Sequence, residues 1–334
     1  MSPHRVTIAD VARRAGVSPT TVSHALNGKG VVHPATRVRV LRTAQKLGYW
    51  PNRAARSLRS GSAATLGLML PAEEFWGIEY YLEFASAAAQ SAFGCDRGLL
   101  LLPALESATD LRRFAIDGAI VVDPVTEDLR LAACEKLGLP TVTVDRDLGR
   151  PSDTWWVGAD NANNTREALD HLIAAGATRV AFLTADVSWS WFDDSVRAYR
   201  SWAREYGVKP CIATTRKTLL EHGAAVAVGR LLDGPDPPDA IFTPPDRFAL
   251  GVLRAARERG LRVPDDLLIA AGVDSSQARL AHPPITAIDL RPAETGRAAV
   301  AMLLARIEGT SVETPQTVAA ELRVRASTMR GEAR

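Results

Sequence analysis

The chain has few cysteines and no long apolar segment. Its 334 residues include three cysteines, at positions 95, 134 and 211, and no two of them form a Cys-X-X-Cys pair. This number and spacing predict neither a disulfide framework nor a zinc site. No apolar run approaches the roughly 20 residues of a membrane-spanning helix, and no secretory signal is visible. We therefore expect no association with a membrane and a cytoplasmic location.

Catalytic sequence motifs are also missing. The chain contains no Gly-X-Ser-X-Gly, no His-Glu-X-X-His and no phosphate-binding Gly-X-X-X-X-Gly-Lys-[Ser/Thr]. The six histidines do not cluster along the sequence. These absences predict a protein that is not an enzyme and that has no metal or cofactor.

Positive charge is concentrated in the first 61 residues. They hold 11 Lys and Arg and one acid, Asp10, which gives a net charge of +10, whereas the whole chain is only +2. The remainder carries 29 basic and 37 acidic residues, a net charge of −8. This asymmetry indicates a polyanionic partner for the N-terminal segment and a different role for the body.

Three short helices are predicted in the basic segment. Thr7 caps the first, which ends at about residue 15 before Gly16, and Asp10 completes a capping box. Ser18 caps the second, which runs over about residues 19–26, and the third covers about residues 34–47. The apolar residues expected to pack together are Ile8, Val11, Ala12, Val22, Ala25, Leu26, Val38, Leu41, Ala44 and Leu47.

The outer face of the second predicted helix is polar and compact. Its side chains, all able to form hydrogen bonds, are Thr20, Thr21, Ser23, His24 and Asn27. A basic three-helix unit is often only a solvated surface, but a short helix with such a face suits the major groove of DNA. The order of helix, glycine turn, Ser-Pro-Thr-Thr and basic helix favours DNA reading.

From residue 65 onward, apolar strands alternate with amphipathic helices. The strands are expected at residues 65–70, 99–102, 119–122, 141–144, 156–157, 180–183, 211–214, 240–242 and 268–272. The clearest helices fall at residues 162–175, 196–206, 224–232 and 250–259. Continuous apolar strands separated by helices predict two successive parallel sheets, with ligand loops at the carboxyl ends of the strands.

The chain resembles the LacI/GalR family of transcription regulators. The similarity is clearest in TIADVARRAGVSPTTVSHALN (residues 7–27) and continues in IDGAIVV (116–122), VDR (144–146) and PPITAIDLRPAETGRAA (283–299). It covers residues 5–329 and is weakest over residues 73–117, where the first subdomain is expected to lack part of a helix.

The resemblance implies an all-α helix-turn-helix headpiece, a hinge helix and an α/β effector domain. The effector domain would consist of two Rossmann-like, parallel-sheet subdomains, as in type I periplasmic binding proteins. The implied boundaries are residues 5–50 for the headpiece, 51–61 for the hinge, 62–161 with 291–317 for the N-terminal subdomain, and 162–290 with 318–330 for the C-terminal subdomain.

The same resemblance implies roles in DNA binding. Thr20 and His24 would touch base edges, and Leu58 would wedge between base steps in the minor groove. The full set of implied DNA-binding residues is Thr7, Ser18, Thr20, Thr21, Ser23, His24, Asn27, Arg53, Ala55, Arg56 and Leu58. The implied partner is double-stranded operator DNA with a pseudo-palindromic sequence, bound by a homodimer that acts as a repressor.

An effector site is predicted from aromatic and charged residues on loops expected to face a cleft. These residues are Phe75, Trp76, Arg146, Trp189, Trp191, Phe192, Ser195, Arg197, Phe242, Asp246 and Asp274. Taken singly, each aromatic residue is more typical of a core position and Asp246 of a helix cap. Their grouping on matching loops favours a small-molecule site.

One departure of the predicted site from the family matters most. The family pattern Arg-X-X-Gly-[Phe/Tyr] has Ser195 in place of its arginine, and Arg197 lies half a turn away. Tryptophan stacks on the apolar faces of sugar rings, so a sugar or oligosaccharide is the first expectation and a nucleobase or aromatic metabolite the second. A solute-binding receptor is the alternative that the body alone permits; the basic headpiece favours the regulator.

Overall fold

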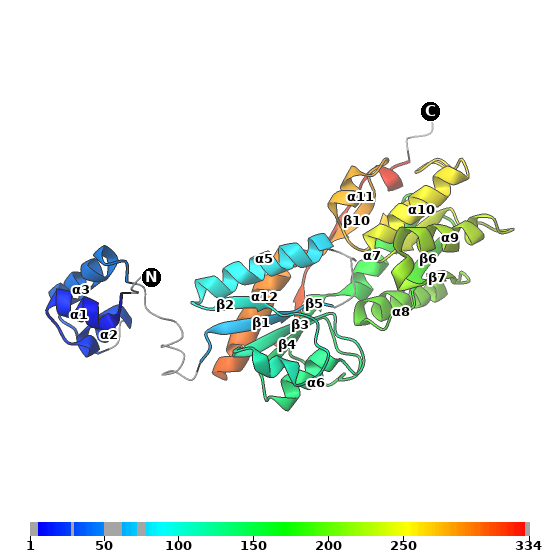
Figure 1. Cartoon of the computed structure of the whole chain (residues 1–334). Coiled ribbons are helices and arrows are strands. Elements are labelled where there is room, and N and C mark those ends of the chain that lie inside the picture. Colours follow the sequence, from blue (N-terminus) through cyan, green and yellow to red (C-terminus); the bar gives the residue numbers. More distant parts are fainter. Residues whose placement is uncertain (1–5, 28–29, 50–61, 72–77, 331–334) are drawn as a thin grey trace. The chain divides into compact units, whose positions relative to one another are not determined.

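A computed structural model describes residues 6–27, 30–49, 62–71 and 78–330 (Figure 1). The chain forms two compact units, residues 1–63 and 64–334. Six of the predicted site residues lie outside the described residues, namely Arg53, Ala55, Arg56, Leu58, Phe75 and Trp76, and so does the side chain of Asn27.

The headpiece contains the three predicted helices, α1 (Ile8–Ala15), α2 (Pro19–Asn27) and α3 (Pro34–Lys46). The Thr7 hydroxyl accepts from the Asp10 amide and the Asp10 carboxylate accepts from the Thr7 amide, which confirms the capping box. Gly16 ends α1 in the left-handed conformation, with φ 64°, where a side chain would be strained. The turn between α1 and α2 therefore follows from local sequence alone.

The predicted packing of α3 was wrong in part. Val40 and Ala44 are buried against α1 and α2, whereas Val38 and Leu41 are 48% and 46% exposed. Helical spacing allows two apolar stripes on α3, one through positions 38, 41 and 44 and the other through positions 40, 44 and 47. Spacing alone therefore did not choose between them. Packing against Val11 and Val22 selects the second stripe.

The body contains two sheets, as predicted, and each has six strands. The first has the order β11-β5-β4-β3-β1-β2 and the second β12-β10-β9-β8-β6-β7. Their strands are β1 (Thr65–Met69), β2 (Gly98–Leu101), β3 (Gly118–Val122), β4 (Thr141–Val144), β5 (Trp156–Ala159), β6 (Val180–Ala185), β7 (Cys211–Thr215), β8 (Ala240–Thr243), β9 (Leu268–Ala271), β10 (Thr286–Asp289), β11 (Gln316–Val318) and β12 (Glu321–Arg323). All the strand pairs of the described residues are parallel except β10 with β12.

Helices cover the two faces of each sheet (Figure 1). Helices α5 (Ile78–Gly94) and α12 (Pro292–Glu308) cover one face of the first sheet, and α6 (Leu129–Lys136) the other. On the second sheet, α7 (Asn161–Ala174) and α8 (Ser190–Glu205) share one face, and α9 (Leu220–Leu232) and α10 (Asp246–Glu258) the other. The short helix α11 (Ser276–Leu280) follows β9.

The first sheet has a smaller crossover than the second. Helix α9 links β7 to β8, whereas the link between β2 and β3 contains a single 3₁₀ turn, Asp110–Arg113. Leu111 and Phe114 from this link pack with Ile116 on the face that α6 also covers. This is the shortening that the sequence indicated over residues 73–117.

The chain passes three times between the sheets. It leaves the first sheet after β5, returns to it between β10 and α12, and leaves again between β11 and β12. Arg291, in the second passage, has a left-handed backbone with φ 51°. No helix among the described residues is both long and apolar enough to cross a membrane.

Candidate effector pocket and DNA-reading surface

The outer face of α2 presents the hydrogen-bonding side chains predicted for it. Thr20 and His24 are exposed, and Thr21 and Ser23 are half-buried. A Cβ on Gly30 would lie 2.6 Å from Nδ1 of His24, so this glycine leaves the room that the imidazole occupies. The side chains of Thr7 and Ser18 cap their helices; the Ser18 hydroxyl accepts from the Thr21 amide at 3.1 Å.

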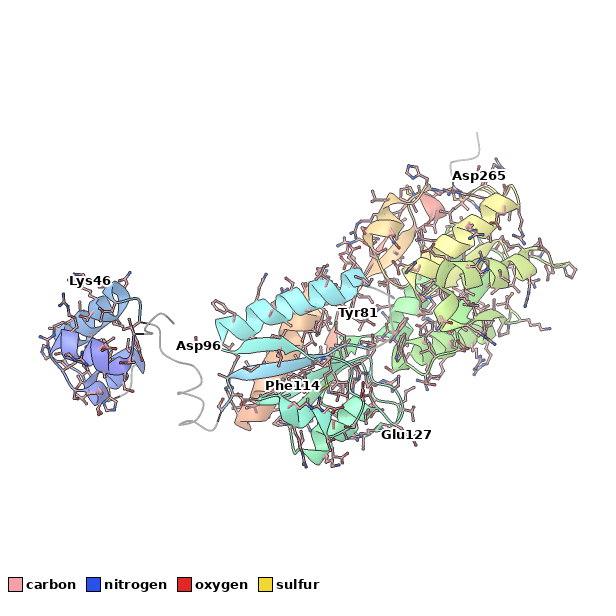
Figure 2. The ribbon with its side chains drawn as sticks, viewed as in Figure 1. Lys46, Tyr81, Asp96, Phe114, Glu127 and Asp265 are labelled. Carbon is pink, nitrogen blue, oxygen red and sulfur yellow. The ribbon has the colours of Figure 1, made fainter. Side chains whose placement is uncertain are left out.

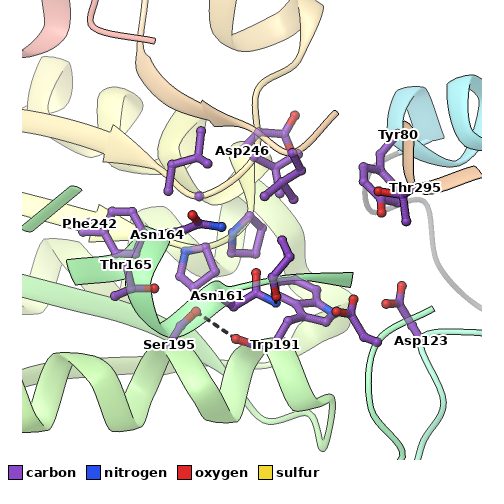
Figure 3. Close-up of a pocket in the computed structure, with 18 of the residues that line it drawn as sticks. Tyr80, Asp123, Asn161, Asn164, Thr165, Trp191, Ser195, Phe242, Asp246 and Thr295 are labelled. Atoms are coloured by element: carbon purple, nitrogen blue, oxygen red, sulfur yellow. Dashed lines mark hydrogen bonds between the residues drawn. The ribbon is translucent and has the colours of Figure 1, made fainter. Parts of the chain in front are cut away.

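The pocket of the body lies between the carboxyl ends of strands from both sheets (Figure 3). Its volume is about 810 Å³ including its open mouth. The first sheet contributes Asp123 after β3 and Asp145 after β4, and the second contributes Phe242 of β8. Such an opening between strand ends is where open α/β sheets bind ligands.

Four of the predicted effector residues line this pocket: Trp191, Ser195, Phe242 and Asp246. Trp191 is half-buried and stacks on Phe192 with ring centroids 4.1 Å apart. The Ser195 hydroxyl donates to the Trp191 carbonyl at 2.8 Å within the same helix (Figure 3). Trp191 is therefore packed against a neighbouring ring at the wall of the pocket.

Trp189 and Phe192 do not line the pocket. Both are buried in the core of the second sheet, because α8 begins at Ser190 and not at residue 196 as predicted. A helix turns by about 100° per residue, so Trp191 faces the pocket while its neighbours face the core. Trp189 lies on the loop before α8, as expected, whereas Trp191 and Phe192 lie on the helix itself, where a loop was expected. Of these three aromatic residues, Trp191 is the one that lines the pocket.

The three remaining predicted effector residues that the structure describes do not line the pocket; each forms ion pairs instead. Asp274 accepts from Arg325 at 2.8 Å and from Arg279 at 3.2 Å. Arg146 and Arg197 both contact Asp194, and Arg197 also lies 2.9 Å from Asp193. Arg197 therefore does not supply a guanidinium in place of the family arginine.

Several lining residues were missed. Tyr80 and Tyr81 come from α5, and Asn161, Asn164 and Thr165 from the first turns of α7. Figure 2 shows Tyr81 at the end of α5 that faces the second sheet. Asp123 and Asp145 directly follow predicted apolar strands, so the strand-end pattern that selected Asp274 also applied to them.

Asp123, which is buried, and Asp145, which is half-buried, form a pair with strained backbones. Both have left-handed backbones, with φ 46° and 65°, their carboxyl groups hydrogen bond to each other, and the Tyr81 hydroxyl donates to Asp123. Burial raises the pKa of Asp145 well above its ordinary value. The negative charges of Asp123 and Asp194 raise that pKa further, while Arg146 lowers it.

Two other polar groups of the pocket are unusual. Burial raises the pKa of the Asp246 carboxyl, against the lowering effect of a hydrogen bond from Ser275. Asn164 is buried, and its Nδ2 has no hydrogen-bond partner among the described residues. An unsatisfied buried donor costs on the order of 1–3 kcal/mol, so Asn164 is a natural contact for an acceptor on a ligand.

Glu79 and Arg146, both from the first subdomain, make contacts that bridge the two sheets. Glu79 of α5 accepts from the Ser276 amide at 2.7 Å and from Arg279 at 2.6 Å. Arg146, which follows β4, donates to both carboxylate oxygens of Asp194 on α8, at 2.5 and 2.7 Å. The relative position of the two sheets is thus tied to groups that lie next to the pocket.

The chain combines a basic helix-turn-helix headpiece with a two-sheet body that contains a cleft. This combination is typical of DNA-binding proteins that respond to a ligand. Residues 7–52 match the family model of bacterial regulatory proteins of the lacI family, and residues 169–328 match that of a periplasmic binding protein-like domain. The chain belongs to the LacI family of DNA-binding transcriptional regulators.

Individual relatives agree with this assignment. The HTH-type transcriptional regulator CelR of Thermobifida fusca is 30% identical over 324 residues, which cover 92% of this chain and 94% of CelR. A solved CelR–cellobiose complex is 27% identical, with a TM-score of 0.72, and covers 97% of this chain and 100% of that one. A lac repressor dimer bound to operator and an anti-inducer has a TM-score of 0.83 at 22% identity, over 98% and 100% of the chains.

Proposed function

We propose that this protein is a cytoplasmic repressor that binds a pseudo-palindromic operator as a homodimer and is controlled by a sugar or oligosaccharide in the pocket. The observation that carries the effector class is the position of Trp191, whose stacked ring forms an aromatic wall of the pocket. The same pocket is lined by carboxylates and amides, which can hydrogen bond to hydroxyl groups. The solved complex of CelR with cellobiose supports this choice. We also propose the domain boundaries given above; the chain changes sheet after β5, between β10 and α12, and between β11 and β12.

The effector would act by changing the relative position of the two sheets. The pocket is lined from both sheets, and the contacts Glu79–Arg279 and Arg146–Asp194 hold them in the arrangement seen. A ligand that binds one arrangement more tightly than another shifts the population toward it. Because the first sheet continues from the hinge segment, such a shift would alter how the two headpieces of a dimer fit their half-sites.

The proposed dimer surface lies on α5 and the edge strand β2. Helix α5 exposes Leu82 and Phe93, the latter 75% exposed, and β2 exposes Leu100 and Leu101. Helix α5 and strand β2 are neighbours in the first subdomain (Figure 1). An apolar surface of this kind marks a protein contact site, and a two-fold dimer uses the same surface on both copies.

Replacing Trp191 with alanine tests the effector site. Removing this wall is expected to weaken effector binding at least tenfold and abolish the effect of the effector on operator binding, because ring stacking is lost. The measurement is DNA binding with and without sugars identified by a thermal-shift screen. Tyr206→Ala is the matched control, an aromatic residue at the end of the same helix but outside the pocket. An unchanged response in W191A would refute the assignment; a nucleobase as the sole active compound would favour the second effector class.

Replacing His24 with alanine tests the DNA-reading face. We expect it to relax base preference at one position in each half-site, by about 1–3 kcal/mol, because a direct base contact is lost. The measurement is operator affinity across a set of single-base variants. Arg42→Ala serves as control, since loss of a basic side chain from α3 should weaken all sequences alike. An unaltered base profile in H24A would contradict the assignment.

A further inference from the structure

We propose that the effector carries a protonated amine, held between the Asp123–Asp145 pair and the rings of Tyr80 and Tyr81, so that the ligand class is an amino sugar. This rests on the proposed function, because it specifies the chemistry of the same pocket. Figure 3 shows Tyr80 and Asp123 on the same side of the pocket, across from Phe242.

The charge of the pocket favours a cation over a neutral or anionic ligand. The described residues that line it include three carboxyl groups, Asp123, Asp145 and Asp246, and no Lys, Arg or His. The neighbouring guanidinium groups are engaged elsewhere, Arg146 with Asp194 and Arg247 with Glu221 at 2.9 Å. Buried carboxylates need a compensating charge or a proton, and an ammonium group supplies that charge.

The aspartate pair is built into the fold. A Cβ on Gly158 would lie 2.4 Å from Oδ1 of Asp145, so the glycine of β5 leaves the space for this carboxyl group. Both aspartates keep left-handed backbones, which cost on the order of 1–3 kcal/mol each and persist where the surroundings enforce them. Two carboxyl groups hydrogen bonded to each other share a proton, and an ammonium donor can take the place of that proton.

The two tyrosines complete an environment suited to an ammonium group. Their rings are nearly perpendicular, at 84°, with centroids 5.7 Å apart, and both line the pocket. Aromatic faces attract cations, and the attraction grows when the cation is desolvated. No group of three or more His, Cys, Asp or Glu that could hold a metal ion occurs among the residues described, which disfavours a divalent cation as the occupant.

The rest of the pocket indicates the remainder of the ligand. Nδ2 of the buried Asn164 lacks a partner among the described residues and requires an acceptor, such as a hydroxyl oxygen. Trp191 offers a flat apolar surface on the side of the second sheet. A ring that bears hydroxyl groups and one ammonium group satisfies the donor, the aromatic wall and the carboxyl pair together.

Three disaccharides with one skeleton test the proposal by isothermal titration calorimetry on the full-length protein. They are the β-1,4-linked disaccharide of glucosamine, its N,N′-diacetylated form, and cellobiose, which differ only at the two carbon-2 positions. We expect the charged disaccharide to bind ten- to a hundredfold more tightly than either neutral one, as hydrogen bonds to charged groups are worth about 1.5–3 kcal/mol.

Removal of the carboxylates should abolish that preference. In the double variant with Asp123→Asn and Asp145→Asn we expect the three disaccharides to bind with affinities within about threefold of one another, because neutral amides replace both acids and no carboxylate of the pair remains. Asp265→Asn, which removes an exposed acid outside the pocket, should keep the wild-type preference. Thermal unfolding and operator binding of each variant establish that it is folded.

The outcomes separate this inference from the proposed function. Equal binding of cellobiose and the charged disaccharide, or a preference that survives in the double aspartate variant, overturns the ammonium site and leaves the sugar-controlled repressor standing. Binding of none of the three also overturns it. The proposed function fails by a different result, namely DNA binding that no pocket ligand and no pocket substitution alters.

Discussion

Replacing Phe93 with aspartate is expected to convert the protein from a dimer to a monomer and to lower its affinity for operator DNA by a factor on the order of 10²–10⁴. Phe93 lies near the C-terminal end of α5 and is 75% exposed, and Leu101 of the neighbouring strand β2 is 60% exposed. A charge placed within an apolar two-fold contact is introduced on both copies, so like charges are desolvated together in one interface. The loss in affinity follows because each headpiece no longer raises the effective concentration of the other at the second half-site.

Sedimentation equilibrium and operator titration of the F93D variant measure the two effects. Val208→Asp is the matched control, since it places the same charge on an exposed apolar residue after α8, outside the α5–β2 surface. A dimeric F93D variant with wild-type operator affinity would remove this surface from the model of the dimer. Effector binding by monomeric F93D should be unchanged, because the pocket lies within one chain.

Replacing Gly296 with valine is expected to destabilise the body by several kcal/mol. A Cβ at this position would lie 2.5 Å from the carbonyl oxygen of Phe84 and 3.2 Å from the amide of Ala88. These are backbone atoms of α5, so the two helices must move apart, and overpacking of a core typically costs about 1–3 kcal/mol or more. The measurement is the free energy of unfolding from denaturant titration of the purified protein.

Gly94→Ala is the matched control for this substitution. Gly94 ends α5, and no atom lies within 4 Å of the Cβ that alanine would add. Its expected effect is a small gain in stability, about 0.4–1 kcal/mol, because the unfolded chain loses conformational freedom. Equal destabilisation by both substitutions would contradict this explanation, because it would mean that the loss of stability does not come from the close approach of α5 and α12.

Local signals were sufficient for most of the fold. The capping box of Thr7 and Asp10, Gly16 and the Pro19 start fixed the first two helices, because caps and turns depend on neighbours in the chain. The parallel sheets were predicted from another local signal, namely short apolar runs separated by helical segments. The C-terminal strands β10, β11 and β12 were missed, as they have only three or four residues each and are defined by pairing with distant segments.

The pocket was harder to predict because orientation depends on where a helix begins. Phe192, Ser195, Tyr199 and Trp202 have helical spacing, which would have extended α8 back to residue 190 and separated core from pocket residues. Tyr80 and Tyr81 carry no such signal, since their place in the pocket depends on how α5 crosses the first sheet. Asp123 and Asp145 were visible as strand-end residues, but their mutual contact requires the adjacency of β3 and β4.

The three passages of the chain between the two sheets restrict how the lobes can move. A pair of bodies joined by one tether can twist, slide and separate, whereas three tethers side by side leave mainly a rocking motion about the line that they define. The segments at residues 160, 290–291 and 319–320 form such a set. The two lobes therefore have few ways to move relative to each other, and under the proposed function a modest tilt of one lobe is the change that an occupied pocket transmits to the DNA.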